Sequence, residues 1–329
     1  MAAAAGLPDW WIERKRSAFA RFAELPLPRR GDESWRFSTV GGVKLDGYAL
    51  PGPATSSGAA EAFAQTAALT FANNRLIRST PIAAELKAKG VIVSTLVEAA
   101  RSHPQILKAH FMAQPQRLGS EKFATLHVAF ATEGAFIYVP RGVELSQPIV
   151  IAHCASGAGA AIFPHTLVVA EENSRVSVVD LFSSTSSDAA SVSRDAQFIC
   201  GANDIYAGHG SNVAYVAVQD WSREALSFQL NSTVVRRDAR VQSLNLHLGG
   251  RQARHESLSQ LQAPGAFSEM LALTAAADSQ EFDQRTLQVH QAPNTKSDLL
   301  YKNVLLDSSK TIFSGLIVVD PDAEKTDAY

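Results

Sequence analysis

Cysteine is scarce in this sequence: Cys154 and Cys200 are the only two among 329 residues. They form no CxxC or Cys/His spacing of a structural zinc site, which argues against both a zinc module and a disulfide framework. No apolar run approaches the roughly twenty residues that a bilayer-spanning helix needs, so we expect no membrane span. Together these features indicate a protein of the reducing cytoplasm.

Strong charge of one sign is also missing. The sequence has 30 basic and 32 acidic residues, a net charge of -2, and no block of like charge long enough to hold a polyanion. Nucleic acid is therefore not expected as a partner. The opening residues 1–6 are apolar but short, and charged residues follow soon after, so they do not predict a signal peptide.

Familiar catalytic motifs cannot be found in the chain. It contains no GxxxxGK[ST] phosphate-binding loop and no GxGxxG dinucleotide motif, so we do not expect it to hydrolyse ATP by itself. The GxSxG and HExxH motifs of common hydrolases and zinc proteases are missing too. The sequence therefore predicts a protein that is not an enzyme, and no residue is assigned a catalytic role.

The first 120 residues have a mixed, mainly helical pattern. Between Asp9 and about Leu25, apolar residues recur near a helical period, and Pro26 and Pro28 then end the pattern. Residues 83–89 and 94–113 also look helical, with a short strand candidate at residues 90–93 between them. We predict an N-terminal domain over residues 1–120.

From residue 121 the chain changes to short apolar alternations separated by turn residues, which is typical of β structure. One series of such segments begins near Val213, Val241, Ser268 and Lys296, and a second begins near Ala225, Arg254, Gln280 and Thr311. Both series repeat at about 28 residues, and two interleaved series with one period are what the coils of a solenoid produce. The pattern predicts a parallel β-helix over residues 121–329.

An antiparallel β-sandwich would also contain many short strands, but it gives no reason for so steady a period. Along one segment, Leu244, Leu246 and Leu248 alternate with Ser243, Asn245 and His247. Since successive strand residues point to opposite faces, we expect the leucines to face the core and the polar residues to face solvent. His247 is thus predicted to be solvated.

Two residues could form a metal or proton site. His255 and Asp283 are separated by one apparent period, about 28 residues, which would place them on adjacent coils of the same face. An outward-facing polar ladder would give the same pattern, so they are only weak metal candidates. Cys154 and Cys200 each end an apolar segment, so both are predicted to be small buried side chains. Two cysteines also cannot fill the four ligand positions of an iron-sulfur cluster.

Several segments resemble the SufB/SufD family of iron-sulfur cluster assembly proteins, and SufD in particular. The resemblance is strongest in YKNVLLD at residues 301–307, FSGLI at 313–317 and EKTDAY at 324–329. It recurs in the ESWRFS motif at residues 33–38 and in residues 130–143. In this family the pattern continues into further core strands and a helical tail, so the chain is expected to be cut before its last strands and its C-terminal helical domain.

The resemblance implies a right-handed parallel β-helix that acts as a non-catalytic scaffold subunit. In the family it pairs with a SufB β-helix, while the C-terminal helices bind a SufC-type ABC ATPase. The complex builds and transfers iron-sulfur clusters, and SufD is linked to iron acquisition and to reduced flavin. A transient cluster, iron or flavin is thus implied for the complex, with no cofactor-binding residue assigned in this chain.

The resemblance also draws attention to His290, which matches a histidine of a SufD-like stretch and is the third weak metal candidate. The family's assisting histidine matches no residue of this sequence, so no catalytic residue is transferred. A different class of protein with this fold is a polysaccharide lyase or hydrolase. Such enzymes carry clustered carboxylates in a solenoid groove and are usually secreted, and neither feature is evident here.

Overall fold

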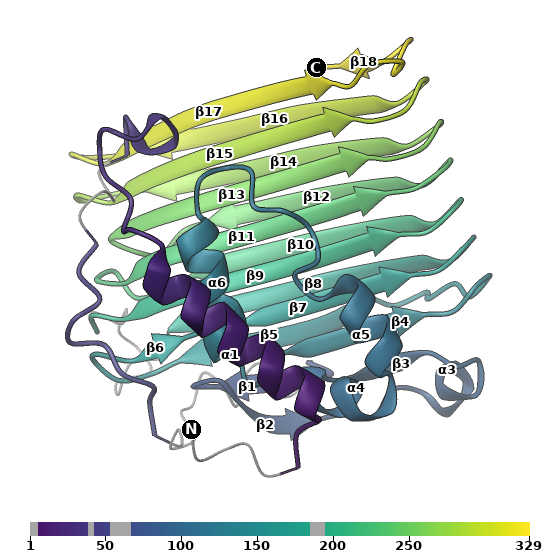
Figure 1. The fold of residues 1–329 in the computed structure, drawn as a ribbon, viewed down its shortest axis with the longest axis horizontal. Helices are drawn as coiled ribbons and strands as arrows, with labels where there is room; N and C mark the ends of the chain where they lie inside the picture. Colours follow the sequence, from purple (N-terminus) through teal and green to yellow (C-terminus); the bar gives the residue numbers. More distant parts are fainter. Residues whose placement is uncertain (1–5, 39–42, 53–66, 185–194) are drawn as a thin grey trace.

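The protein is described by a computed structural model that covers residues 6–38, 43–52, 67–184 and 195–329. Helices gather in the N-terminal part and long parallel strands fill the rest (Figure 1). The helical elements are α1 (Asp9–Glu24), the 3-10 helix η1 (Glu33–Trp35), α3 (Ala84–Ala88), α4 (Leu96–Ser102), α5 (Pro104–His110) and α6 (Glu121–Phe130).

The strands form two sheets that share each coil of a parallel β-solenoid. Sheet 1 runs in the order β18 (Asp327–Ala328), β16 (Lys296–Leu305), β14 (Phe267–Ala276), β12 (Arg240–His247), β10 (Asn212–Asp220), β8 (Arg175–Ser184), β5 (Ile149–Ala155), β1 (Leu69–Ala72) and β2 (Arg75–Ser79). Sheet 2 runs in the order β17 (Lys310–Val319), β15 (Glu281–His290), β13 (Gln252–Leu261), β11 (Leu226–Val235), β9 (Phe198–Ala207), β7 (His165–Ala170), β4 (Ala135–Val139) and β3 (Ile92–Thr95), with β6 (Ala161–Ile162) beside β9.

The register confirms the predicted parallel solenoid and its period. In sheet 1 the strand residues Asn212, Arg240, Phe267 and Lys296 are aligned from coil to coil, close to the predicted series. The interval between aligned residues is not constant, however. It is 26 residues between Asn231 and Ser257 but 29 residues between Arg254 and Asp283. This variation matters for any pair of residues placed by spacing alone.

The predicted helices form, but one of them is divided. The segment 94–113 contains α4 and α5, separated because Pro104 begins α5. Thr95 and Glu98 form a capping box at the start of α4, since each side chain accepts a hydrogen bond from the other's backbone N–H. Strands β1 and β3 of the same N-terminal region extend sheets 1 and 2. In the ranges covered, no helix is both long and apolar enough to cross a membrane.

Helices α1 and α6 lie over the outer face of sheet 2 (Figure 1). They are antiparallel, and each supplies a lysine to the end of the other. Lys122 donates a hydrogen bond of 2.8 Å to Phe22 O at the end of α1, while Lys15 donates to Val128 O (3.2 Å) and Ala131 O at the end of α6. A cation at a helix C-terminus is favourable because it meets unpaired carbonyls and the negative end of the helix dipole.

The interior of the solenoid is mainly apolar in the early coils, apart from a polar group around His153 and Asp180, and mainly polar in the later ones. Ile151, Val168 and Ile205 belong to the early core. On β12, however, Asn245 and His247 are buried and align with the core residues Ala217 and Gln219 of β10, so they face inward.

The expectation that Leu244, Leu246 and Leu248 face the core is therefore wrong. Leu244 and Leu246 alternate with the buried residues of β12 and point outward from sheet 1, and Leu248 follows the end of the strand. Alternation fixes that two sets of residues face opposite sides, but not which side is the interior. Here the register with β10 decides it, and the apolar set lies outside.

Candidate functional site

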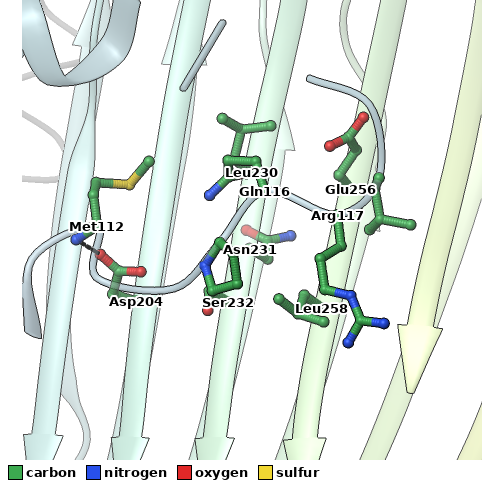
Figure 2. A pocket seen from close by; sticks show the side chains of 11 residues that line it. Met112, Gln116, Arg117, Asp204, Leu230, Asn231, Ser232, Glu256 and Leu258 are labelled. Atoms are coloured by element: carbon green, nitrogen blue, oxygen red, sulfur yellow. Dashed lines mark hydrogen bonds between the residues drawn. The ribbon is translucent and has the colours of Figure 1, made fainter. Parts of the chain in front are cut away.

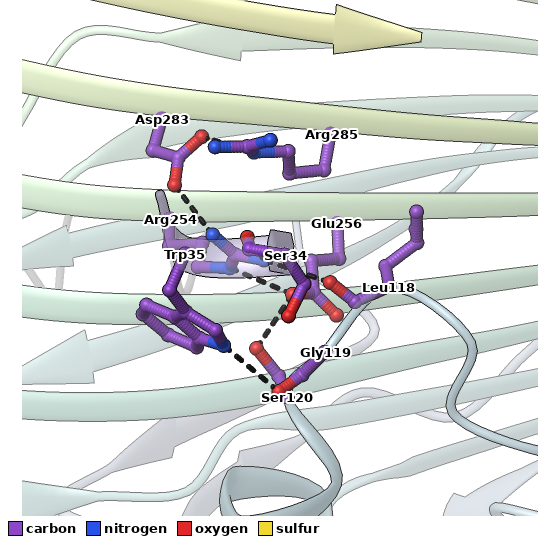
Figure 3. A network of polar contacts seen from close by, with 9 residues as sticks. All are labelled: Ser34, Trp35, Leu118, Gly119, Ser120, Arg254, Glu256, Asp283 and Arg285. Carbon is purple, nitrogen blue, oxygen red and sulfur yellow. Dashed lines mark hydrogen bonds and ion pairs between the residues drawn. The ribbon is translucent and has the colours of Figure 1, made fainter. Parts of the chain in front are cut away.

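A buried network of charges joins the N-terminal segments to sheet 2, and Arg254 is at its centre (Figure 3). The Arg254 guanidinium donates hydrogen bonds to Glu256 Oε1 at 2.7 Å and to Asp283 Oδ2 at 2.5 Å. It also donates to Ser34 O at 3.1 Å and Leu118 O at 2.7 Å. The side chain of Arg254 is fully buried, so these contacts take place out of solvent.

The rest of the network balances the charge and holds an aromatic ring. Arg285 donates to Asp283 Oδ1 at 2.6 Å, which gives two guanidinium groups for the two carboxylates of Asp283 and Glu256. The Arg254 guanidinium lies over the Trp35 ring, with its central carbon 3.8 Å from the ring centroid. The indole N–H of Trp35 donates a hydrogen bond of 3.0 Å to Gly119 O. A buried ion pair is tolerated best when its polar atoms have hydrogen-bond partners. Here the N-terminal segments supply several of them: Ser34 O and Leu118 O accept from Arg254, and Ser120 donates to Glu256 Oε1.

This arrangement gives the ESWRFS motif at residues 33–38 a physical role. Its tryptophan stacks on Arg254 and also contacts Phe123 and Phe228, while the carbonyl of Ser34 accepts from Arg254. The motif thus anchors the N-terminal region to the middle of the solenoid. Sequence reasoning missed Arg254 because its partners are 136 and 220 residues away in the chain.

Asp283 belongs to this network and not to a site with His255. The β13–β15 register places Asp283 opposite Arg254 and places His255 opposite Gln284. The interval between these coils is longer by one residue than the spacing on which the predicted pairing depended. A slip of one residue moves a side chain to the other face of the sheet, so the predicted His255–Asp283 pair is wrong.

His255 lies inside the solenoid, where its ring stacks on that of His247. The two ring centroids are 3.7 Å apart and the planes are inclined by 14°. Both side chains are buried, so the prediction of a solvated His247 is also wrong. Burial lowers the pKa of His255 to about 3, and burial together with His255 holds the pKa of His247 well below its usual value. Both rings are neutral at pH 7.

His290 is buried further along the same interior. Its Nδ1 lies 2.7 Å from Thr295 Oγ1 and its Nε2 lies 3.0 Å from Ser297 Oγ, so hydroxyl groups occupy both ring nitrogens. The three weak metal candidates thus occupy three separate environments. Within the described part of the chain, no group of three or more His, Cys, Asp or Glu side chains is arranged to hold a metal ion.

A second polar chain, not found from the sequence, lies between α6 and sheet 2. His127 Nδ1 lies 2.7 Å from Cys200 O, His127 Nε2 lies 3.0 Å from His165 Nδ1, and His165 Nε2 lies 3.5 Å from Asp204 Oδ2. The carbonyl can only accept, so His127 donates from Nδ1 and accepts from His165 through Nε2. Burial lowers the pKa of His127 to about 4 and raises that of Asp204 to about 7.

A related group faces the interior from sheet 1. His153 is stacked between Phe71 and Phe182, with ring centroids 5.0 and 5.2 Å away, and its Nε2 lies 3.5 Å from Asp180 Oδ1. Tyr215 donates a hydrogen bond of 2.8 Å to Asp180 Oδ2. Burial lowers the pKa of His153 to about 3 and raises that of Asp180 to about 7. No sequence motif marks either group, because the members come from different coils.

The prediction that both cysteines are small buried side chains is confirmed. Cys200 Sγ lies 3.2 Å from Phe123 O, and burial raises the pKa of both thiols above the ordinary value. A buried thiol with a raised pKa is a poor nucleophile and a poor metal ligand.

We therefore expect neither thiol to react with a thiol-specific dye in the native protein. Labelling should be slower than in denaturant by about 100-fold or more, since the reactive thiolate is both scarce and covered. Dye absorbance with and without urea measures this directly. Fast labelling of either cysteine under native conditions would show that its burial is only transient.

A small cavity lies where the connector between α5 and α6 crosses sheet 2 (Figure 2). Met112 N donates a hydrogen bond of 2.6 Å to Asp204 Oδ2 at one end, and Arg117 and Glu256 line the other. The cavity has a volume of about 10 Å³, which is room for about one water molecule. The cavity therefore accommodates neither a cofactor nor a substrate. Its walls instead hold the connector in place over β9, β11 and β13.

Comparison with known proteins identifies the family. The description "SUF system FeS cluster assembly, SufBD core domain" matches residues 153–329, and "SufBD protein N-terminal region" matches residues 7–151. The chain belongs to the SufBD family. The core match covers the solenoid from β5 onward, and the N-terminal match covers the helices and the motif that anchors them to Arg254.

The chain is also similar to curated proteins that are named as iron-sulfur cluster assembly proteins. The iron-sulfur cluster assembly protein SufD of Bacillus subtilis is 24% identical over 98% of this chain and 74% of its own length. A SufBD family protein of Synechocystis is 24% identical over 96% of this chain and 71% of its own length. A SufBD family protein of Staphylococcus epidermidis is 25% identical over 71% of this chain and 49% of its own length.

Proposed function

We propose that this SufBD family member is a cytoplasmic, non-catalytic scaffold subunit of an iron-sulfur cluster assembly complex. It pairs through its solenoid with a SufB-like subunit, and a SufC-like ABC ATPase supplies the energy. Iron, or a nascent cluster, is the cargo of the complex, and this chain aids its acquisition. The family match supports assembly over the polysaccharide lyase or hydrolase alternative.

The observation that carries the proposal is the family match, which covers the solenoid from β5 onward and the N-terminal helices packed on it. In the part of the chain that is described, β17 is the last strand of sheet 2, and β16 pairs with β18 only through Lys296 and Ser297. Exposed aliphatic and aromatic side chains gather on these two strands: Leu300, Val304, Leu305, Phe313, Leu316, Ile317 and Val319. Apolar side chains on strand edges of this kind are covered in a complete fold or assembly, either by further strands of the same protein or by a partner's sheet.

The chain contributes structure to the complex, and its partners contribute the chemistry. Its two thiols are buried with raised pKa values, and its buried histidines are neutral at pH 7. Thiolate ligands for a cluster would thus come from the SufB-like subunit. This chain would position that subunit.

Reduced flavin is a further expectation for such a complex, and one groove offers a test of fit. An aromatic groove of about 210 Å³ lies between α1, α6 and β6. Its lining includes Phe19, Tyr48, Phe130 and Phe163, and none of its eleven lining residues is charged. A flavin nucleotide carries phosphate groups that require cationic or backbone N–H partners. The groove alone does not fit them, so we assign no flavin step to it.

The test is co-purification of this chain with the SufB-like and SufC-like proteins of the same organism. Leu316→Asp places a charge on the exposed β17 surface and should reduce the recovered SufB-like subunit by about 10-fold or more, since a charge at an apolar contact is costly to desolvate. Leu27→Asp is the matched control, because Leu27 is a similarly exposed leucine outside the solenoid. Equal recovery with both variants would contradict the proposed surface.

A further inference from the structure

A polar cavity lies inside the solenoid, between the inner faces of sheets 1 and 2. Its volume is about 20 Å³, and strands of both sheets form its walls. None of the ten described residues that line it is charged. Most of them carry an amide or a hydroxyl group, and those that matter below are Asn203, Tyr215, Asn231 and Ser257. This cavity is therefore a neutral, polar space within the core of the later coils.

Asn203 is the lining residue whose hydrogen bonding is least complete. Its side chain is 1% exposed, and within the described ranges neither Oδ1 nor Nδ2 has a hydrogen-bond partner. The register aligns Asn203 with Asn231 on β11, and Asn231 with Ser257 on β13, and all three line the cavity. Because a buried amide without partners is strongly disfavoured, this amide indicates a bound molecule. That molecule must donate to Oδ1 and accept from Nδ2.

Two neighbours of Asn203 have hydrogen-bonding capacity for the same molecule. Tyr215 donates its hydroxyl proton to Asp180 Oδ2 at 2.8 Å, so its oxygen can still accept. One N–H of the Asn231 amide donates to Ser257 Oγ at 3.3 Å, and the amide has a second N–H. Donors and acceptors from three neighbouring strands thus meet at one cavity.

The size and the neutrality of the cavity select water as the ligand. A volume of about 20 Å³ is room for about one or two water molecules, and an organic molecule does not fit. An ion is disfavoured, because a buried charge needs a compensating charge and no described lining residue carries one. Water both donates and accepts, as the two atoms of Asn203 require. We propose that this cavity is a water-binding site in which about one or two buried waters complete the hydrogen bonds of Asn203.

The bound water links two polar groups along the interior. On one side of the cavity, Tyr215 leads to Asp180 on β8. On the other side, Asn231 leads to Ser257, which is hydrogen-bonded to Tyr301 on β16. With water between Tyr215 and Asn231, one hydrogen-bonded network runs through the coils from β8 to β16. The water thus helps to hold the two sheets together where the interior is mainly polar.

A high-resolution crystal structure of the purified chain tests the proposal directly. It needs no other subunit, so a failure here leaves the proposed function untouched. Electron density for water should lie within hydrogen-bond distance of Asn203 Oδ1 or Nδ2. An empty cavity, or an anomalous signal that reveals an ion, would overturn the proposal.

Magnetic relaxation dispersion of water oxygen-17 counts the buried waters in solution. Asn203→Leu removes both amide atoms and fills the cavity, so it should lose about one or two long-lived waters relative to the wild type. Asn203→Ser keeps a group that donates and accepts, and it should retain them. Asn212→Leu, on the outer face of sheet 1, is the matched control and should have the wild-type count. An equal count in the wild type and in Asn203→Leu would contradict the site.

Urea unfolding distinguishes a hydrated cavity from a dry one. Asn203→Leu should lower the urea midpoint, because displacing the water leaves Tyr215 and Asn231 without a hydrogen-bond partner at the cavity. In a dry cavity the same substitution would remove an unpaired amide and raise the midpoint. A raised midpoint would therefore overturn the proposal. If Asn203→Leu does not fold, the wild-type crystal structure and the water count of Asn203→Ser decide the question.

Discussion

Arg254→Met should lower the free energy of unfolding by about 3–5 kcal/mol, the cost of removing one partner from a buried ion pair. The substitution leaves the carboxylates of Asp283 and Glu256 with one guanidinium group between them, and it leaves the carbonyls of Ser34 and Leu118 without their donor. Methionine fills most of the space, so the loss reflects electrostatics and hydrogen bonding more than a cavity. Urea unfolding followed by circular dichroism measures the change.

Arg251→Met is the matched control for this variant. Arg251 precedes the same strand, but its ion pair with Glu224 is 3.8 Å long and the side chains are 55% and 42% exposed. An exposed pair of this kind contributes about 0–1 kcal/mol. Arg254→Met should also release the N-terminal segments, which limited trypsin cleavage after Arg117 would reveal. A loss below about 1 kcal/mol, or unchanged cleavage, would contradict the anchoring role.

Stability should fall steeply as the pH is lowered from about 6.5 to about 4. Among the buried histidines, five have pKa values well below the unfolded value of 6.5, whereas that of His290 is lowered less: the five are His127, His153, His165, His247 and His255. In this window the unfolded chain binds protons that the folded rings cannot accept, so unfolding takes up five protons. Asp180 and Asp204 act in the opposite direction, because their folded pKa values are raised to about 7 and they release two protons on unfolding.

The net uptake is therefore about three protons, equivalent to about 4 kcal/mol per pH unit. Urea midpoints between pH 7 and pH 4.5 measure the slope. His255→Leu should reduce the slope by about 1.4 kcal/mol per pH unit, whereas the half-exposed His209→Gln serves as the control. A stability that rises on acidification through this window would contradict neutral buried rings and would point instead to histidines that gain carboxylate partners on folding.

The solenoid itself could be predicted from the sequence, because the apolar segments recur at an interval of about one coil. Strands predicted to begin near Val213 and Val241 begin one residue earlier, at Asn212 and Arg240. The helix predicted from Asp9 to about Leu25 is observed as Asp9–Glu24. These elements could be predicted because the pattern of apolar residues within each segment determines whether it forms a helix or a strand.

The predictions that were wrong required knowing which face of a strand points inward, or the register between two strands to within one residue. Alternation along β12 is the same whether Leu246 or His247 faces the core, and the polar interior of the later coils reverses the usual choice. An interval longer by a single residue was enough to separate His255 from Asp283. Arg254 could not be found at all, since its partners Ser34 and Leu118 approach it only in the folded chain.

The central claim is that this SufBD family member is a scaffold subunit of an iron-sulfur assembly complex. Native mass spectrometry of the chain co-expressed with its SufB-like and SufC-like partners, combined with iron and sulfide analysis, tests it most directly. The account predicts one stable complex that contains all three proteins, and a loss of bound iron and sulfide when this chain is omitted. A complex of the two partners with the same cluster content, and no association with this chain, would contradict it.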